Sequence, residues 1–290
     1  MRPFQLHQPQ SLAETFDLLA QQPDETHLMA GGTSLMLLMQ LGLAEPARVI
    51  PLRRIAGLDA IAPQPDGGLE IGALATHRQA ELSPAVRAYC PALSATFAHV
   101  ATVRIRNQAT VGGNLAHADP AQDPPPMLIA LDASVVLSSA AGERSLPLDA
   151  FFVDYLTTRL EPGEVLTAVR LPPLPEGTRA TYEKFLPRTH DDYATVSVAA
   201  TLRVDADGRC QDVRVALGGV AGVPLHARAV EDALRGEVLT DARIAEAAAL
   251  VTDLVDPPDD VRGSAAYKRR MARVWTERAL RKLRDDGALA

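Results

Sequence analysis

The sequence predicts an α+β fold in two domains. A chain of 290 residues is longer than one hydrophobic core usually serves, so more than one domain is expected. Prolines and a glycine gather at 172–177 and predict a boundary, with domains at 1–176 and 177–290. Beyond this boundary, strand patterns come first and helical patterns follow to the end of the sequence, an order typical of an α+β domain.

The first domain begins with an extended segment and a short helix, followed by two strands on either side of the first glycine pair. Ser11 and Glu14 have the spacing of a capping box at the start of an amphipathic helix. A later strand leads into the adjacent Gly31 and Gly32, so the opening is βαβ-like but lacks the Gly-x-Gly-x-x-Gly fingerprint of dinucleotide-binding folds. The elements expected in this domain are strands at 27–30, 48–52 and 69–74, helices at 11–19, 35–39, 76–82 and 92–98, and a β-hairpin over 134–148.

The second domain shows two β-strand patterns around a turn at 205–208. The segment 195–202 is apolar and β-branched over most of its length, which favours a strand. Helical patterns occupy the rest of the domain. The elements expected here are strands at 195–202 and 210–217 and helices at 227–234, 241–254 and 264–283.

Two glycine pairs carry the clearest functional signal. They lie in Ala30-Gly31-Gly32-Thr33-Ser34 and in Thr110-Val111-Gly112-Gly113-Asn114, and neither segment contains Lys or Arg. Because glycine has no Cβ, successive backbone N–H groups can turn toward an anion and bind it through dipoles. We expect Thr33 or Ser34 to be the N-cap of the helix that follows, which would aim its N-terminus at the ligand. A pair of such segments predicts a diphosphate ligand; the alternative is two tight turns.

Composition and charge exclude several classes of function. The net charge of −7 argues against nucleic-acid binding, and the basic runs 53–54 and 268–270 are short enough to be solvated faces. No apolar run approaches the ~20 residues that span a bilayer, and the first residues lack the apolar core of a signal peptide. We therefore expect no membrane span and a cytoplasmic location.

Cysteine and histidine patterns predict no metal centre in the chain. Cys90 and Cys210 are far apart, so neither a disulfide framework nor an iron–sulfur cluster held by this chain is expected. His117, Asp119 and Asp123 lie close in sequence, but a Pro-rich stretch follows and no i, i+4 histidine pair occurs. No Gly-x-Ser-x-Gly nucleophile motif is present, and we name no catalytic residue.

Three ordered motifs give the chain a family resemblance. They are the first glycine segment with Leu35, the segment 110–120 with Asp123, and Lys184-Phe185-x-x-Arg188 with 191–194. In these motifs the chain resembles the FAD-binding medium subunit of molybdenum hydroxylases, the family of xanthine dehydrogenase, aerobic carbon monoxide dehydrogenase and aldehyde dehydrogenase-type enzymes. The resemblance implies a two-lobed FAD-binding domain of the PCMH or vanillyl-alcohol oxidase type, with lobes at about 1–54 and 55–176. A smaller C-terminal domain of antiparallel strands and helices would follow.

The resemblance also implies a cofactor site. Both glycine segments would hold the FAD pyrophosphate, Asp123 would contact ribose or ribityl hydroxyls, and Leu166 would make an apolar contact. Lys184 would lie near the isoalloxazine, with Tyr193 against or beside the ring. Taken singly, Asp123 could instead cap a helix, Leu166 could be ordinary core, and Lys184 could be exposed in a strand. The cofactor-binding residues expected are Leu28, Met29, Ala30, Gly31, Gly32, Thr33, Ser34, Leu35, Thr110, Gly112, Gly113, Asn114, Asp123, Leu166, Lys184 and Tyr193.

The function implied by the resemblance is electron transfer. A large molybdenum-cofactor subunit would oxidise the substrate, a small [2Fe-2S] subunit would relay electrons, and this chain would pass them to NAD, oxygen or another acceptor. Cys90 and Cys210 cannot supply the four ligands of the [4Fe-4S] cluster found in one variant of the family. Two alternatives remain open: a noncatalytic module that binds a nucleotide such as ADP or coenzyme A, and a self-sufficient flavin oxidase.

Overall fold

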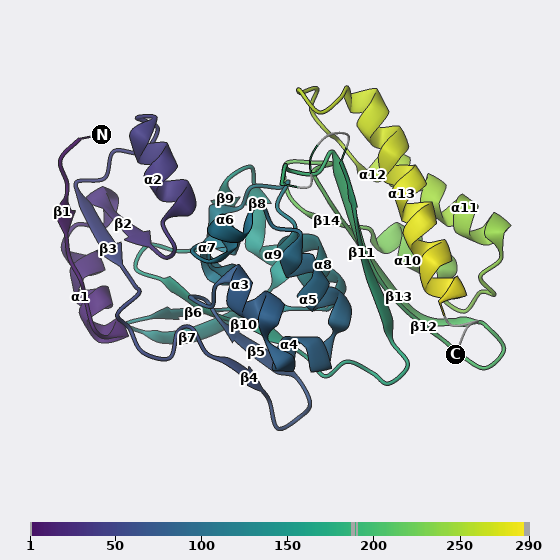
Figure 1. Cartoon of the computed structure of the whole chain (residues 1–290), viewed down its shortest axis with the longest axis horizontal. Helices are drawn as coiled ribbons and strands as arrows, with labels where there is room; N and C mark the ends of the chain where they lie inside the picture. The colour runs from purple at the N-terminus through teal and green to yellow at the C-terminus, as the bar shows by residue number, and fades with distance from the viewer. Residues whose placement is uncertain (1, 187–188, 190, 287–290) are drawn as a thin grey trace.

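The N-terminal lobe is a small parallel sheet with two helices. The computed structural model describes residues 2–186, 189 and 191–286. Its first sheet has the strand order β1-β3-β2, and both outer strands run parallel to β3, which confirms the βαβ-like opening (Figure 1). The elements of this lobe are β1 (Gln5–Leu6), α1 (Leu12–Gln21), the 3-10 helix η1 (Pro23–Glu25), β2 (Thr26–Met29), α2 (Thr33–Gln40) and β3 (Arg48–Pro51).

The start of α1 corrects the predicted capping box. The Ser11 hydroxyl accepts a hydrogen bond from the Glu14 N–H, as expected. The Glu14 carboxylate, however, accepts from the Gln10 N–H at 2.7 Å, one residue before the N-cap. The complete reciprocal box occurs instead at Thr76 and Gln79, at the start of α3 (His77–Leu82). Thr76 is thus the residue that fixes where a helix of the central lobe begins.

The central lobe is an antiparallel sheet covered by helices. Its strand order is β4-β5-β10-β6-β7, and β6 with β7 forms the predicted hairpin. Alternate residues of the central strands, such as Ile71, Leu137 and Val169, are fully buried against helices that include Leu93 and Phe97. The elements are β4 (Ile61–Pro63), β5 (Leu69–Gly72), α3, α4 (Pro84–Tyr89), α5 (Pro91–Ala98), α6 (Val103–Arg106), α7 (Val111–His117), α8 (Pro124–Ala130), β6 (Ser134–Ser139), β7 (Gly142–Pro147), α9 (Leu148–Phe151), β8 (Phe152–Asp154), β9 (Thr157–Thr158) and β10 (Val165–Leu171).

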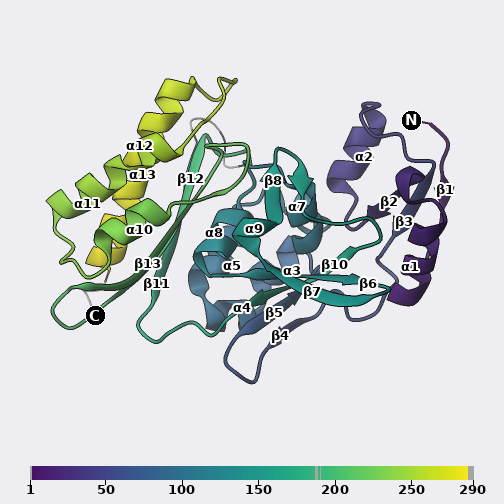
Figure 2. The same ribbon diagram turned by 180° about the vertical axis from the view of Figure 1, so that it is seen from behind.

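The C-terminal domain is an antiparallel meander of four strands followed by helices, which confirms the α+β prediction (Figure 2). The predicted helix at 241–254 is divided in two, since α11 ends at Ala249 and α12 begins at Val251. The elements are β11 (Arg179–Phe185), β12 (Val196–Val204), β13 (Cys210–Gly218), β14 (Leu225–His226), α10 (Arg228–Leu234), α11 (Asp241–Ala249), α12 (Val251–Leu254) and α13 (Ala265–Asp285).

The sheet of the C-terminal domain is buried on both faces, which explains the apolar pattern of β12. Val196 and Val198 point into a core shared with Leu280 of α13. Ala199, on the opposite face, joins the core that contains Met127 of α8. Helix α8 therefore connects the central lobe to the C-terminal domain through apolar packing. None of the helices in the described ranges combines the length and the apolar character of a bilayer-spanning segment.

Candidate functional site

The first glycine segment, residues 30–34, joins β2 to α2. Gly32 is the N-cap of α2 and has φ +77°, a left-handed conformation that glycine adopts without strain. The predicted N-cap at Thr33 or Ser34 is therefore wrong, because both residues already belong to the first helical turn. Among the described residues, no side chain caps this N-terminus. The first-turn N–H groups of α2 are the orphan donors that an anion can accept.

The second glycine segment, residues 110–114, is helical and not a turn. Gly112 and Gly113 lie in the first turn of α7, and Thr110 is the N-cap. The Thr110 hydroxyl accepts a hydrogen bond from the Gly113 N–H at 3.1 Å. The alternative of a tight turn is wrong here, because the threonine cap and burial of Val111 stabilise a helix in spite of the two glycines.

The two glycine segments are packed against each other. A Cβ at Gly31 would overlap the carbonyl oxygen of Gln108, just before the second segment. A Cβ at Gly113 would lie 3.1 Å from the Cβ of Ala30. A Cβ at Gly112 would overlap Ala73 of the central lobe. The absence of side chains at these glycines thus lets segments from two lobes meet at backbone distance.

Two cavities flank this meeting point. The first cavity, of about 810 Å³, has Arg53, Arg54 and Arg78 in its wall together with both glycine segments. The second cavity, of about 430 Å³, is more apolar, with Leu35 and Leu166 in its wall. The predicted site residues in the first wall are Met29, Ala30, Gly31, Gly32 and Thr110. Those in the second wall are Leu28, Met29, Ala30, Gly31, Gly32, Leu35, Gly112, Gly113 and Leu166.

A third cavity, of about 290 Å³, brings together Asn114, Asp123 and Tyr193. Asn114 is in α7, one residue beyond the glycine pair that lines the second cavity. Three of the predicted site residues, Thr33, Ser34 and Lys184, are not among the described residues that line these cavities. Helix α7 therefore links the second cavity to the third.

Asp123 and Lys184 form a buried ion pair beside the third cavity. The Lys184 Nζ lies 2.9 Å from one Asp123 carboxylate oxygen and also donates to the His99 carbonyl oxygen. The Tyr182 hydroxyl donates to the other carboxylate oxygen at 2.6 Å. Burial raises the pKa of Asp123 to about 6, and Lys184 and Tyr182 oppose that rise. Asp123 makes no side-chain cap to α8, and Lys184 is buried in the pair and not exposed.

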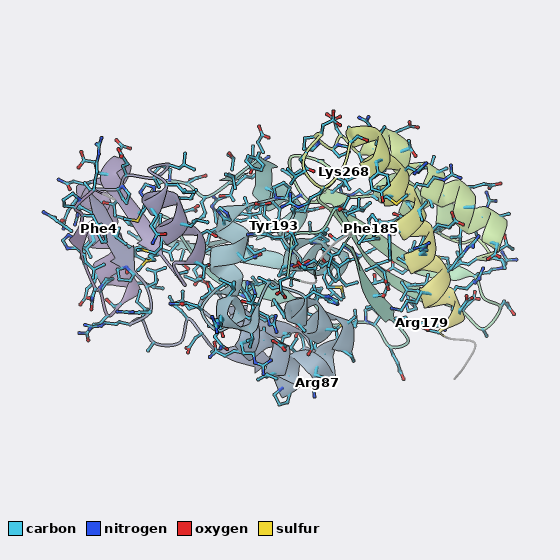
Figure 3. The ribbon with its side chains drawn as sticks, turned by 45° about the horizontal axis from the view of Figure 1, so that its top comes forward. Phe4, Arg87, Arg179, Phe185, Tyr193 and Lys268 are labelled. Carbon is cyan, nitrogen blue, oxygen red and sulfur yellow. The ribbon has the colours of Figure 1, made fainter. Side chains whose placement is uncertain are left out.

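Tyr193 lies close to the junction of the central lobe and the C-terminal domain (Figure 3). The Arg262 guanidinium lies 5.3 Å from the centroid of its ring. Burial, followed by the Asp119 and Asp123 carboxylates, raises the pKa of Tyr193 to about 12. Tyr193 also lines a fourth cavity of about 750 Å³, which includes Arg262. The neutral Tyr193 side chain thus lies in the walls of both the third and the fourth cavity.

Unpartnered polar atoms in the third cavity test whether a cofactor fits. Within the described residues, His77 Nδ1 and Nε2, Asn114 Oδ1 and Gln122 Oε1 are buried and have no hydrogen-bond partner. All three residues line the third cavity. Because buried polar atoms without partners cost free energy, this arrangement fits a polar ligand with donors and acceptors on its edge. A flavin ring offers both.

Sequence reasoning missed some of these residues. His77 and Gln122 were not predicted, because the missing hydrogen-bond partner arises from packing and leaves no local pattern. Gln122 directly precedes Asp123 of the second motif, and this neighbourhood was the signal that could have identified it. Arg53 and Arg54 are exposed, as the interpretation of a solvated face predicted, and they also line the first cavity. Across the described ranges, no group of three or more His, Cys, Asp or Glu residues could hold a metal ion.

Comparisons with known proteins show the family to which the chain belongs. Residues 2–174 match the FAD binding domain in molybdopterin dehydrogenase, and residues 180–283 match the CO dehydrogenase flavoprotein C-terminal domain. The carbon monoxide dehydrogenase medium chain of Hydrogenophaga pseudoflava is 35% identical over 277 residues, which are 96% of each chain. The 6-hydroxypseudooxynicotine dehydrogenase complex subunit alpha of Paenarthrobacter nicotinovorans is 35% identical over 272 residues, 94% of this chain and 91% of that one.

Solved structures give the same result for the whole fold. A chain of the carbon monoxide dehydrogenase from Hydrogenophaga pseudoflava superimposes with a TM-score of 0.93 and 36% identity, covering 97% of this chain and 98% of that one. A chain of quinoline 2-oxidoreductase from Pseudomonas putida 86 superimposes with a TM-score of 0.92 and 34% identity, and the match covers 98% of both chains. This chain belongs to the family of FAD-binding medium subunits of molybdenum hydroxylases, and its cofactor is FAD.

Proposed function

We propose that this chain transfers electrons through its FAD within a heteromeric molybdenum hydroxylase. A small [2Fe-2S] subunit supplies the electrons, a large molybdenum-cofactor subunit oxidises the substrate, and a terminal acceptor takes the electrons from this chain. Support comes from relatives whose names call them medium chains or subunits of dehydrogenases. The observation that carries the proposal is the contact between the two glycine segments at the wall of two cavities.

We assign the parts of the cofactor by the chemistry of the walls. The pyrophosphate lies at the glycine segments, where the N-terminus of α2 has no side-chain cap among the described residues. The adenosine occupies the second cavity, whose wall includes Leu35 and Leu166. The isoalloxazine occupies the third cavity, beside Asp123 and Tyr193. Helix α7 runs between these two cavities and supports the ribityl chain.

The protein groups around the third cavity set the electrostatic potential at the proposed position of the isoalloxazine ring. The bound flavin supplies one-electron and two-electron redox chemistry. Lys184 supplies a positive charge behind Asp123, and the pair keeps a cation close to the ring cavity without exposing it. Asp123 has a pKa of about 6, so it is mostly ionised at pH 7 and protonated at pH 5. Tyr193 covers the cavity with an uncharged face.

A titration of the full chain tests the proposal. We expect the flavin-free protein to bind FAD stoichiometrically, with visible flavin absorption and altered flavin fluorescence. Gly113→Leu places a side chain toward Thr110 and Ala30 and is expected to abolish binding. The control is Gly142→Leu in the β6–β7 hairpin: its φ of +129° makes the variant strained, so we expect lower apo stability, but no atom lies within 4 Å of its Cβ position and we expect unchanged FAD affinity. A wild-type chain that cannot be reconstituted with FAD would overturn the proposal.

Two further measurements separate the alternatives. If ADP or coenzyme A binds as tightly as FAD, the nucleotide-binding module is favoured. If the isolated chain oxidises an organic substrate, the self-sufficient oxidase is favoured. We expect neither result. We expect purification from the native host to yield this chain with a molybdenum-containing large subunit and an iron–sulfur small subunit, identified by mass spectrometry and metal analysis.

A further inference from the structure

His77 is the most unusual buried group outside the residues already assigned. It is 0% exposed, and neither ring nitrogen has a hydrogen-bond partner among the described residues. Its ring stacks on Phe97 with a centroid distance of 5.7 Å. Burial, and then the charge of Arg106, lower its pKa to about 4. The imidazole is therefore neutral at physiological pH, with one N–H donor and one lone-pair acceptor.

The backbone holds His77 beside the second glycine segment. The backbone N–H of His77 donates to the Ala109 carbonyl oxygen at 3.0 Å, and Thr76 forms a β-bridge with Thr110. The start of α3 is therefore fixed against the start of α7, and these helices lie next to each other in the central lobe (Figure 1). This anchoring places the His77 ring in the wall of the third cavity.

The third cavity has an apolar part and a polar part. Val100, Ala101 and Ile105 provide apolar wall. His77 and Gln122 add polar atoms without partners, while both oxygens of Asp123 are already occupied by Tyr182 and Lys184. A planar heteroaromatic ring with a polar edge matches such walls, because its faces need apolar contact and its edge needs hydrogen bonds.

We propose that His77 and Gln122 are positioning residues that hydrogen-bond the pyrimidine edge of the flavin ring. His77 donates its N–H to a ring carbonyl oxygen, and the Gln122 amide oxygen accepts from the ring N–H between the two carbonyls. This inference rests on the proposed placement of FAD. It explains why two buried polar side chains lack partners in the protein itself.

The experiment compares apo stability with FAD affinity in the full chain. His77→Phe keeps the aromatic stack on Phe97 and removes both nitrogens. We expect the unfolding free energy of the apo variant to be no lower than that of the wild type, because an unpaired buried polar group is removed. We expect its dissociation constant for FAD to rise on the order of tenfold, because one hydrogen bond is lost. The reduction midpoint of the bound flavin becomes more negative, since the reduced ring loses a donor.

Two variants serve as checks. Gln122→Leu removes the second partner and is also expected to weaken FAD binding, so the test survives if His77→Phe fails to fold. Thr276→Val is the matched control, because Thr276 on α13 is 0% exposed and its hydroxyl also lacks a partner among the described residues. We expect this control to leave FAD affinity and midpoint unchanged.

The outcomes separate this inference from the proposed function. If FAD affinity or midpoint in both cavity variants stays at the wild-type value, the assignment of the ring edge is overturned while the FAD site stands. If the wild-type chain itself binds no FAD, the proposed function fails and this inference fails with it. Weaker binding with an undiminished apo stability in either variant, together with a more negative midpoint, supports the inference.

Discussion

The two glycine segments use the same residue pair in different ways. In the first segment Gly32 has a left-handed backbone and begins α2 without a side-chain cap among the described residues. In the second, Gly112 and Gly113 lie inside α7 behind a threonine cap. One glycine of each pair is required by packing. Backbone atoms of Gln108 fill the space of a Cβ at Gly31, and atoms of Ala73 fill it at Gly112. The comparison separates glycines that build the fold from glycines that we propose face the ligand.

The largest expected effect breaks the packing around the two glycine segments. Gly31→Ala and Gly112→Ala each place a Cβ onto atoms that have no room to move, namely the Gln108 carbonyl and Ala73. We expect the unfolding free energy of the apo chain to fall by about 3 kcal/mol or more. Denaturant unfolding followed by circular dichroism measures it. A loss of FAD binding with unchanged apo stability would contradict this role.

Asp123, a buried carboxyl group, follows the second glycine segment in the chain. The pH dependence of the unfolding free energy tests whether its pKa is raised. The pKa of Asp123 is about 6 in the folded chain against an ordinary 3.8, so the folded state binds the proton more tightly. Its contribution to stability therefore falls as pH rises from 4 to 6, by about 3 kcal/mol.

Asp123→Asn removes this dependence. We expect the unfolding free energy of the wild type to decline relative to that of the variant over this pH range. Urea unfolding at several pH values measures the difference. Parallel pH profiles for the two proteins would show that Asp123 does not titrate there.

Backbone strain at the first segment gives a smaller effect. Gly32→Ala forces alanine to φ +77°, at a cost of about 1 to 2 kcal/mol. Gly208→Ala is the matched control, because Gly208 has φ +74° with no atom within 4 Å of its Cβ position. We expect similar losses of apo stability in both variants and weaker FAD binding in Gly32→Ala alone. Equal FAD affinities measured by fluorescence titration would contradict the assignment of Gly32.

The smallest effect concerns the cap. Thr110→Val removes the hydrogen bond to the Gly113 N–H and is expected to lower the unfolding free energy by about 1 kcal/mol. Thr33→Val has no such consequence, because the N-cap of α2 is Gly32. Thermal unfolding of the two apo variants compares them directly. A larger loss of unfolding free energy in Thr33→Val than in Thr110→Val would contradict the assignment of the two N-caps.

Local sequence chemistry predicted much of the fold. The βαβ-like opening, the hairpin of β6 and β7 and the strand meander follow from apolar patterning and turn residues. Helices α7 and α8 were not predicted, since paired glycines and three prolines have poor helix propensity that tertiary burial overrides. The family motifs implied FAD, which the comparisons confirm, while the residues assigned to its site stay a prediction. His77 was not predicted, because an unpaired nitrogen is a property of the packed structure.

The central claim is that both glycine segments together hold one diphosphate. The most direct measurement is the affinity of the flavin-free full chain for FAD and for FMN, by fluorescence titration under identical conditions. Both ligands carry the same ring, but only FAD carries a diphosphate and an adenosine. We predict that FAD binds at least about tenfold more tightly than FMN. Equal affinities for the two flavins would contradict the claim.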